Sequence, residues 1–146
     1  MPTYTISQRI ESQDLDVAQV TNELGIQPTQ SRRKGDRRSE NSVWEKALWE
    51  IEIFSDGDRS EWESLEAGLE ELVRLLTPHL PTLKKYKKSC EIYLWCGVFD
   101  PSFGGGPRLS AETLSKLSAL GAPVLFAIYP EMSKSEEEAD SSLRSE

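Results

Sequence analysis

The run CEIYLWCGVF, residues 90–99, decides the fold of this chain. Its apolar side chains occupy both alternating faces of an extended backbone: Ile92, Tyr93, Leu94, Trp95, Cys96 and Val98. A strand that is apolar on both faces is typical of the interior of a sheet. We therefore predict a central strand over residues 90–99.

Three more strands are predicted around this one. Residues 3–10 and residues 47–54 alternate apolar and more polar side chains, which indicates strands with one buried face. Residues 124–129 form a short apolar run and are predicted as the last strand. Between these strands, apolar residues recur at helical spacing.

The first and last predicted helices have clear capping signals. The first has Asp14 as its N-cap and ends at Gly25, and Pro28 prevents it from continuing. The last begins after Ser110 and ends at Gly121. Both therefore have the same plan, a polar cap followed by an amphipathic helix that closes on Leu-Gly.

A long helix is predicted in the middle of the chain. It begins with a capping box of Ser60 and Glu63, and Pro78 and Pro81 are expected to stop it. A basic turn with Lys84, Lys85, Lys87 and Lys88 then leads into the central strand. The polar side of the long helix is expected to be a solvated face; its charged residues are Glu63, Glu66, Glu70, Glu71 and Arg74.

The resulting β-α-β-α-β-α-β order predicts an α+β domain over residues 1–132, with a four-stranded, mainly antiparallel sheet covered by helices. Residues 133–146 are acidic and rich in serine, and we expect a disordered tail. Two similar strand-helix-strand units, residues 3–54 and 90–129, suggest a ferredoxin-like sandwich with the long helix inserted. An apolar last strand at a sheet edge counts against that arrangement.

The chain has 146 residues and a net charge of -8, yet residues 31–38 contain five basic residues and one acidic residue. The acidic field of the whole domain disfavours binding to double-stranded nucleic acid. No apolar run approaches the roughly 18 residues of a membrane span, and no signal peptide is recognisable. We therefore expect a cytoplasmic protein without a membrane role.

The basic loop is the strongest candidate site. Arginine binds carboxylates and phosphates through paired hydrogen bonds, and Gly35 permits a tight turn with exposed amide groups. The alternative is that the basic side chains pair with acids of their own domain, for example Glu63, Glu66 or Glu70. The candidate ligand- or partner-binding residues are Arg32, Arg33, Lys34, Gly35, Arg37, Arg38 and Trp44.

Tryptophan is the other residue type that could contribute to binding. Trp49, Trp62 and Trp95 occupy positions predicted to face the core. Trp44 follows the basic loop and could lie exposed beside it, where an aromatic ring and arginines could bind a nucleotide or a single-stranded nucleic-acid segment. Packing remains the alternative for Trp44.

No catalytic, metal or cofactor site is predicted. Cys90 and Cys96 are about 20 Å apart on one strand, which is too far for a disulfide, and neither has ligands at metal-binding spacing. His79 has no partner fixed by local geometry. The glycines at 104–106 lack the lysine of a phosphate-binding loop. Only a pocket lined by His79, Tyr93 or Asp100 would revive an enzymatic interpretation.

Several short motifs, in this order and spacing, resemble the bacterial domain-of-unknown-function family 4279: LGIQP at 24–28, RKGD at 33–36, Trp44, LSAE at 109–112, LGA at 120–122 and Ile128-Tyr129. The resemblance covers about Tyr4 to Tyr129. It implies a small α+β domain with a Lys-Gly element after the first helix, and it brings no catalytic residues. Similar families include small bacterial immunity and interaction proteins.

We therefore expect a non-enzymatic interaction domain, for example of immunity type, that binds a protein partner through its acidic surface or its basic loop. The alternative function is binding of a small anion or a nucleotide by the same loop.

Overall fold

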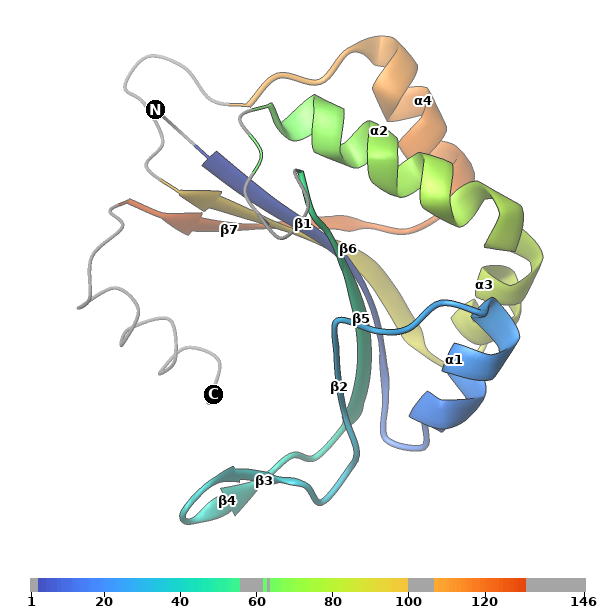
Figure 1. Ribbon diagram of the computed structural model, residues 1–146, viewed down its shortest axis with the longest axis vertical. Coiled ribbons are helices and arrows are strands. Elements are labelled where there is room, and N and C mark those ends of the chain that lie inside the picture. The colour runs from blue at the N-terminus through green and yellow to red at the C-terminus, as the bar shows by residue number, and fades with distance from the viewer. Residues whose placement is uncertain (1–2, 56–61, 63, 100–106, 131–146) are drawn as a thin grey trace.

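The computed structural model describes residues 3–55, 62, 64–99 and 107–130. In this part of the chain a five-stranded sheet has the order β2-β5-β1-β6-β7, and a two-stranded hairpin, β3-β4, stands apart from it (Figure 1). All neighbouring strands are antiparallel except β6 and β7, which are parallel. The strands are β1 (Thr3–Ser12), β2 (Gln30–Arg32), β3 (Arg37–Ser39), β4 (Ser42–Val43), β5 (Ala47–Ile53), β6 (Glu91–Phe99) and β7 (Val124–Tyr129).

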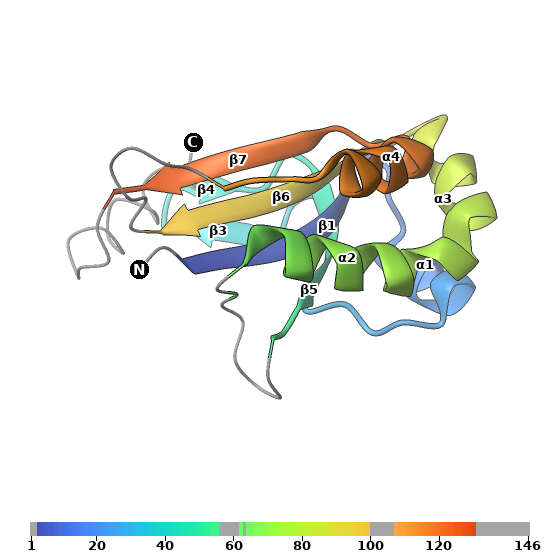
Figure 2. The ribbon, with the colours of Figure 1, turned by 90° about the horizontal axis from the view of Figure 1, so that it is seen from above.

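The helices lie on one face of this sheet (Figures 1 and 2). They are α1 (Val17–Leu24), α2 (Leu65–Leu76), the 3-10 helix η1 (Thr77–His79), α3 (Leu80–Lys87) and α4 (Ala111–Leu120). The α+β class and the interior position of the strand at residues 90–99 are confirmed, since β6 lies between β1 and β7. None of the helices in these segments is long and apolar enough to cross a membrane.

The predicted four-stranded sheet and its ferredoxin-like order are wrong. In a ferredoxin-like sandwich a strand of the second half lies between the two strands of the first half. Here β1 and β5, both from the first half, pair directly and antiparallel. The cause is the segment between them, because it contributes β2 as a fifth strand and returns the chain through the β3-β4 hairpin.

Local capping explains most helix boundaries. The N-cap of α1 is Asp16 rather than the predicted Asp14, because the Asp16 carboxylate accepts a hydrogen bond from Gln19 N at 3.1 Å. Ser110 and Gly121 cap α4 as predicted, and Gly121 has the left-handed φ of 70° that closes a helix. The predicted cap at Ser60 and Glu63 lies outside the described residues, and α2 is capped by Ser64.

The long helix α2 ends at Leu76, just before Pro78, as predicted, but the chain continues in further helices. Pro78 and Pro81 stand in the first turns of η1 and α3, respectively, where a missing backbone N–H breaks no intrahelical hydrogen bond. The basic turn predicted at Lys84 to Lys88 is therefore wrong, and these lysines belong to α3 and its C-cap. The glycines at 104–106 and the tail from 133 lie outside the described residues.

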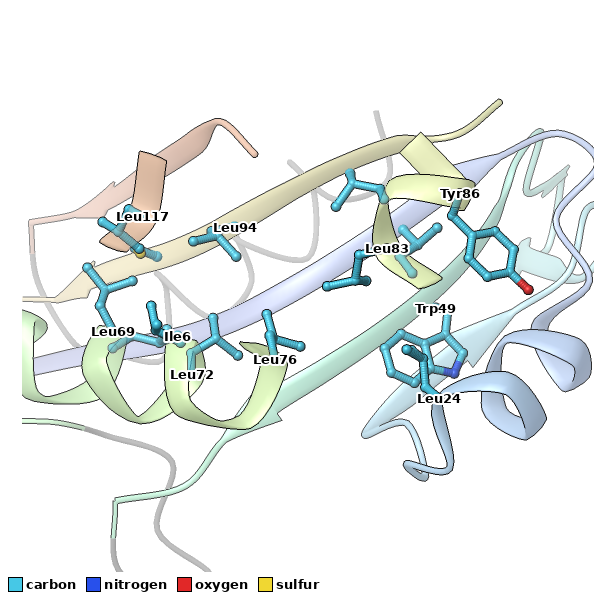
Figure 3. Packing of buried hydrophobic residues seen from close by; sticks show 14 of the residues in the cluster. Ile6, Leu24, Trp49, Leu69, Leu72, Leu76, Leu83, Tyr86, Leu94 and Leu117 are labelled. Carbon is cyan, nitrogen blue, oxygen red and sulfur yellow. The ribbon is translucent and has the colours of Figure 1, made fainter. Parts of the chain in front are cut away.

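The core lies between the helices and the sheet (Figure 3). Leu69, Leu72 and Leu76 of α2 pack over Ile6 of β1, and all four side chains are buried. Gly68 permits this close approach, because a Cβ atom there would overlap Ile6 Cδ1. Trp49 is buried as predicted and donates a hydrogen bond to Thr21 Oγ1 at 3.0 Å.

Alternation along the strands places a second set of residues on the sheet face opposite the helices. Trp95 was expected in the core but lies on this opposite face, half-buried, where Ser7 is its cross-strand partner. Trp62 is also only partly buried, and its indole N–H donates to Ile53 O at 3.1 Å. The face opposite the helices is called the open face below.

Candidate functional site

The predicted basic loop forms a projecting hairpin. Residues 32–44, here called the basic arm, include the end of β2 and both strands β3 and β4. The arm extends from the β2-β5 side of the sheet and away from the helices (Figure 1). A partner can reach a projecting arm of this kind with little interference from the rest of the domain.

Two arginines and one tryptophan form the base of the arm. The guanidinium carbon of Arg32 lies 3.5 Å from the centroid of the Trp44 ring, and that of Arg38 lies 5.0 Å from it. All three side chains are half-buried. Burial lowers the pKa of Arg32, and the Glu11 carboxylate, 3.9 Å away, opposes this shift without cancelling it. These cation–π contacts give Arg32, Arg38 and Trp44 a structural part in the arm.

Backbone hydrogen bonds define the turn at residues 33–36, which lies beside Trp44 at the base of the arm. Gly35 has a φ of 93°, which favours glycine, and its amide donates to Trp44 O at 2.8 Å. Asp36 N donates to Arg33 O at 3.0 Å, while the Asp36 carboxylate accepts from Arg33 N at 2.8 Å. The amides of Arg33, Gly35 and Asp36 therefore bind within the arm. The sequence-based expectation that this turn exposes amides for an anion is wrong for these three.

Three cations in and next to this turn have no acidic side chain as partner within the described segments. Arg33, Lys34 and Arg37 are exposed, and Arg37 Nη1 donates a hydrogen bond to the backbone oxygen of Glu40 at 3.2 Å. Residues 32–44 contain five basic and two acidic residues, so the charge of the arm is only partly balanced, by Asp36 and Glu40 within it and by Glu11 near Arg32 at its base.

Two of the acids named as alternative partners of the basic loop form other contacts. Glu66 accepts a hydrogen bond from Ser110 N at 2.5 Å, and Glu70 accepts from Thr113 Oγ1 at 2.8 Å and Lys116 Nζ at 2.9 Å. The polar side of α2 is thus a contact with α4 at these two positions, not a solvated face. Glu63 lies outside the described residues.

The open face holds a second cluster that the sequence analysis missed. Glu50, with 7 % of its side chain exposed, accepts from Ser7 Oγ at 2.8 Å and Arg9 Nε at 2.5 Å. Arg9 also lies over the Trp95 ring, 4.6 Å from the centroid. Burial opposes the charge of Arg9, but the Glu50 carboxylate outweighs it and raises the pKa of Arg9.

This cluster borders a polar pocket of about 260 Å³ on the open face. The lining residues are Thr5, Ser7, Arg9, Gln30, Glu50, Glu52, Trp95 and Phe99. Because Glu50 already compensates Arg9, the pocket lacks the unbalanced positive charge that a phosphate would need. Alternation in residues 5–9 and 48–52 hinted at a shared face, but the pairing of β1 with β5 was needed to bring these residues together.

The residues considered for catalysis do not converge. Tyr93 lies on the open face beside Arg9, whereas His79 lies in the helical layer on the other side of the sheet. Asp100 is outside the described residues. Within the described segments, no three His, Cys, Asp or Glu side chains gather closely enough to hold a metal ion. Cys90 and Cys96 are both free thiols.

A family model described as "Domain of unknown function (DUF4279)" matches residues 2–131. This chain belongs to the DUF4279 family. No curated protein and no solved structure matches it. The match includes both the basic arm and the open face, so both surfaces are part of the DUF4279 domain.

Proposed function

We propose that this DUF4279 domain is a non-enzymatic binding module whose basic arm engages an acidic surface of a partner protein. The observation that carries the proposal is the exposure of Arg33, Lys34 and Arg37 on a projecting hairpin without acidic partners among the described residues. Arginine and lysine side chains placed in this way bind carboxylates through charge-assisted hydrogen bonds.

A protein fits this arm better than a nucleic acid. The chain carries a net charge of -8, so a long polyanion approaching the arm would meet repulsion from the rest of the domain. A protein with a local acidic patch needs only a limited contact area. Neutralisation of a toxin, as in immunity proteins, is one form that such an interaction could take.

The alternative function is that the same arm binds a small anion or a nucleotide. The two candidates differ in what they require, because a small anion is usually held by backbone amides as well as side chains. The amides of Arg33, Gly35 and Asp36 are bonded within the arm. This argues for contact through side chains and so favours the protein partner.

The first experiment measures binding of a deca-glutamate peptide by fluorescence anisotropy at rising salt. The test variant is Arg33→Ala/Lys34→Ala/Arg37→Ala, and the matched control is Arg74→Ala/Lys84→Ala/Lys88→Ala, which removes three positive charges from exposed positions on the helices. We expect the affinity of the natural chain for the peptide to fall as salt rises. Relative to the natural chain, the arm variant should bind about tenfold or more weakly, and the control variant should bind about equally well.

A second experiment uses the same two variants as baits in cell extract. A protein retained by the natural chain and by the control variant, but not by the arm variant, supports the proposal. Equal affinity and equal capture by both variants would overturn it. A thermal shift with phosphate or nucleotides that disappears in the arm variant would instead favour the small-anion alternative, since ligand at 100 times its Kd adds about 2.7 kcal/mol.

A further inference from the structure

The β7 strand forms one edge of the main sheet, and no described strand pairs with its outer side (Figure 2). Its sequence is VLFAIY, and the surrounding run from Gly121 to Pro130 contains no charged residue, in a chain whose net charge is -8. Soluble proteins usually protect such an edge with charges, a proline or a bulge. Residues 124–129 have none of these.

The backbone of β7 has hydrogen-bonding groups that point outward. Leu94 N donates to Pro123 O at 2.9 Å, and β6 and β7 are parallel without a register shift. In a parallel ladder, alternate residues bond to the neighbouring strand, so Leu125 and Ala127 turn their amides and carbonyls toward β6. Those of Phe126 and Ile128 therefore point away from the sheet.

The side chains of this edge are apolar on both faces. Phe126 is 44 % exposed and Ile128 is 55 % exposed on the face that carries the helices, and Leu125 is 46 % exposed on the open face. Tyr129 lies on the open face as well, stacked on Phe99 with 4.8 Å between ring centroids. An exposed apolar strand with free backbone groups is a template for a further strand.

We propose that β7 pairs antiparallel with the β7 strand of a second copy of this chain, about a two-fold axis at Ala127. In this register Phe126 lies opposite Ile128 of the second copy, and Leu125 lies opposite its Tyr129. Phe126 and Ile128 then exchange backbone hydrogen bonds through their outward groups. The strand is complementary to itself, as a two-fold interface requires.

A second copy fits this edge for two further reasons. The edge is uncharged, so pairing there brings no acidic side chain of β7 against another, although both molecules are acidic. The basic arms lie beyond the opposite edge, next to β2, and stay free in the dimer. The dimer thus goes beyond the proposed function, because it would present two arms to a partner.

The exposed apolar area of β7 indicates how tightly the two copies should bind each other. Three half-exposed side chains offer roughly 300 Å² of apolar surface, compared with about 800 Å² per partner in a standard interface. Backbone hydrogen bonds and flanking contacts add to this, and we expect a dissociation constant in the micromolar range, about 1 to 100 μM.

The test is sedimentation velocity of the full chain across protein concentration, compared with Ile128→Lys and Phe54→Lys. Both positions are exposed, 55 % and 43 %, each variant adds one positive charge, and Phe54 lies outside both β7 and the basic arm. We expect Ile128→Lys to raise the dimer dissociation constant about tenfold or more, and Phe54→Lys to change it little. Salt should strengthen the dimer by screening the repulsion between acidic copies, whereas it should weaken binding by the arm.

The register is tested by disulfide formation in a Cys90→Ser background. Ala127→Cys places two thiols opposite each other across the two-fold axis, at a Cα separation of about 4.5 Å that permits a disulfide. Leu125→Cys, which lies opposite Tyr129 of the second copy, is the matched control and should not form one. A natural chain that stays monomeric at several hundred micromolar, or Ala127→Cys that crosslinks no faster than Leu125→Cys, would overturn the proposal.

Discussion

At the residue scale, Glu50 shows how one buried carboxylate organises the open face. It accepts hydrogen bonds from both Ser7 and Arg9 and has 7 % of its side chain exposed. Breaking a buried ion pair costs about 3–5 kcal/mol, and partial exposure reduces this. With 19 % of the Arg9 side chain exposed, we predict that Glu50→Ala lowers the free energy of unfolding by about 2 kcal/mol.

Urea denaturation at neutral pH measures this effect. Glu45→Ala removes an exposed carboxylate and is the control, for which we expect a change near zero. The double variant Arg9→Met/Glu50→Ala should recover part of the loss, because it no longer leaves an unpaired guanidinium. Equal stability of Glu50→Ala and Glu45→Ala would show that the pair contributes nothing.

The two cysteines differ in their surroundings. Burial raises the pKa of Cys96 to about 12, so its thiol stays protonated and unreactive well above neutral pH, while Cys90 is only half-buried. We predict that a thiol reagent at pH 8 modifies Cys90 in the folded protein and modifies Cys96 only after unfolding. Mass spectrometry of the labelled peptides checks this, and equal labelling rates would contradict it.

At the scale of elements, the contact between α2 and β1 depends on a glycine. A Cβ atom at Gly68 would overlap Ile6 Cδ1 and press on the Trp62 ring. Replacing glycine by alanine in a helix gains about 1 kcal/mol in propensity, whereas overpacking a core costs about 1–3 kcal/mol. We predict that Gly68→Ala destabilises the fold by about 1–2 kcal/mol net, because the overlap with Ile6 is severe.

Thermal unfolding of Gly68→Ala beside Ser115→Ala checks this prediction. Ser115 lies exposed on α4, so its replacement should leave the melting temperature nearly unchanged. If Gly68→Ala melted at or above the temperature of the natural chain, α2 would be shown to shift away from β1 without cost.

At the scale of the whole molecule, three carboxylates join different helices. Hydrogen bonds from Lys85, from Ser110 N and from Lys116 lower the pKa of Glu23, Glu66 and Glu70, respectively. The folded state therefore holds protons less tightly than the unfolded chain, where the ordinary value is 4.5. The stability from these groups is fully present above pH 4.5 and is lost as the pH falls through the folded pKa values.

The melting temperature, measured between pH 7 and pH 3, tests whether stability is lost in this direction of pH. We expect Glu23→Gln/Glu66→Gln/Glu70→Gln to be less stable than the natural chain at pH 7 and to lose less stability on acidification. The control Glu40→Gln/Glu45→Gln/Glu91→Gln has the same change in charge at exposed positions, and its loss should follow that of the natural chain. If the melting temperature of both triple variants fell equally steeply with pH, Glu23, Glu66 and Glu70 would not be the source of the pH dependence.

Local patterns in the sequence predicted what depends on neighbouring residues. Alternation in residues 47–54 and a short apolar run at 124–129 predicted two strands, and Ser110 with Gly121 predicted both ends of α4, because capping and pleating act within a few residues. The end of α2 before Pro78 was predicted, but η1 and α3 were not, since a proline in a first turn starts a helix as readily as it ends one.

Only the tertiary structure decided which strands are neighbours, and the candidate surfaces depend on that. The basic arm was visible in the sequence as five positive charges in eight residues. Only the hairpin showed that these residues have two different roles. Arg32 and Arg38 contact the Trp44 ring, whereas the other three basic residues are exposed. The Arg9–Glu50 pair spans 41 positions and was not visible at all. Pairing across such distances depends on which arrangement buries the most apolar surface, and no local pattern encodes that choice.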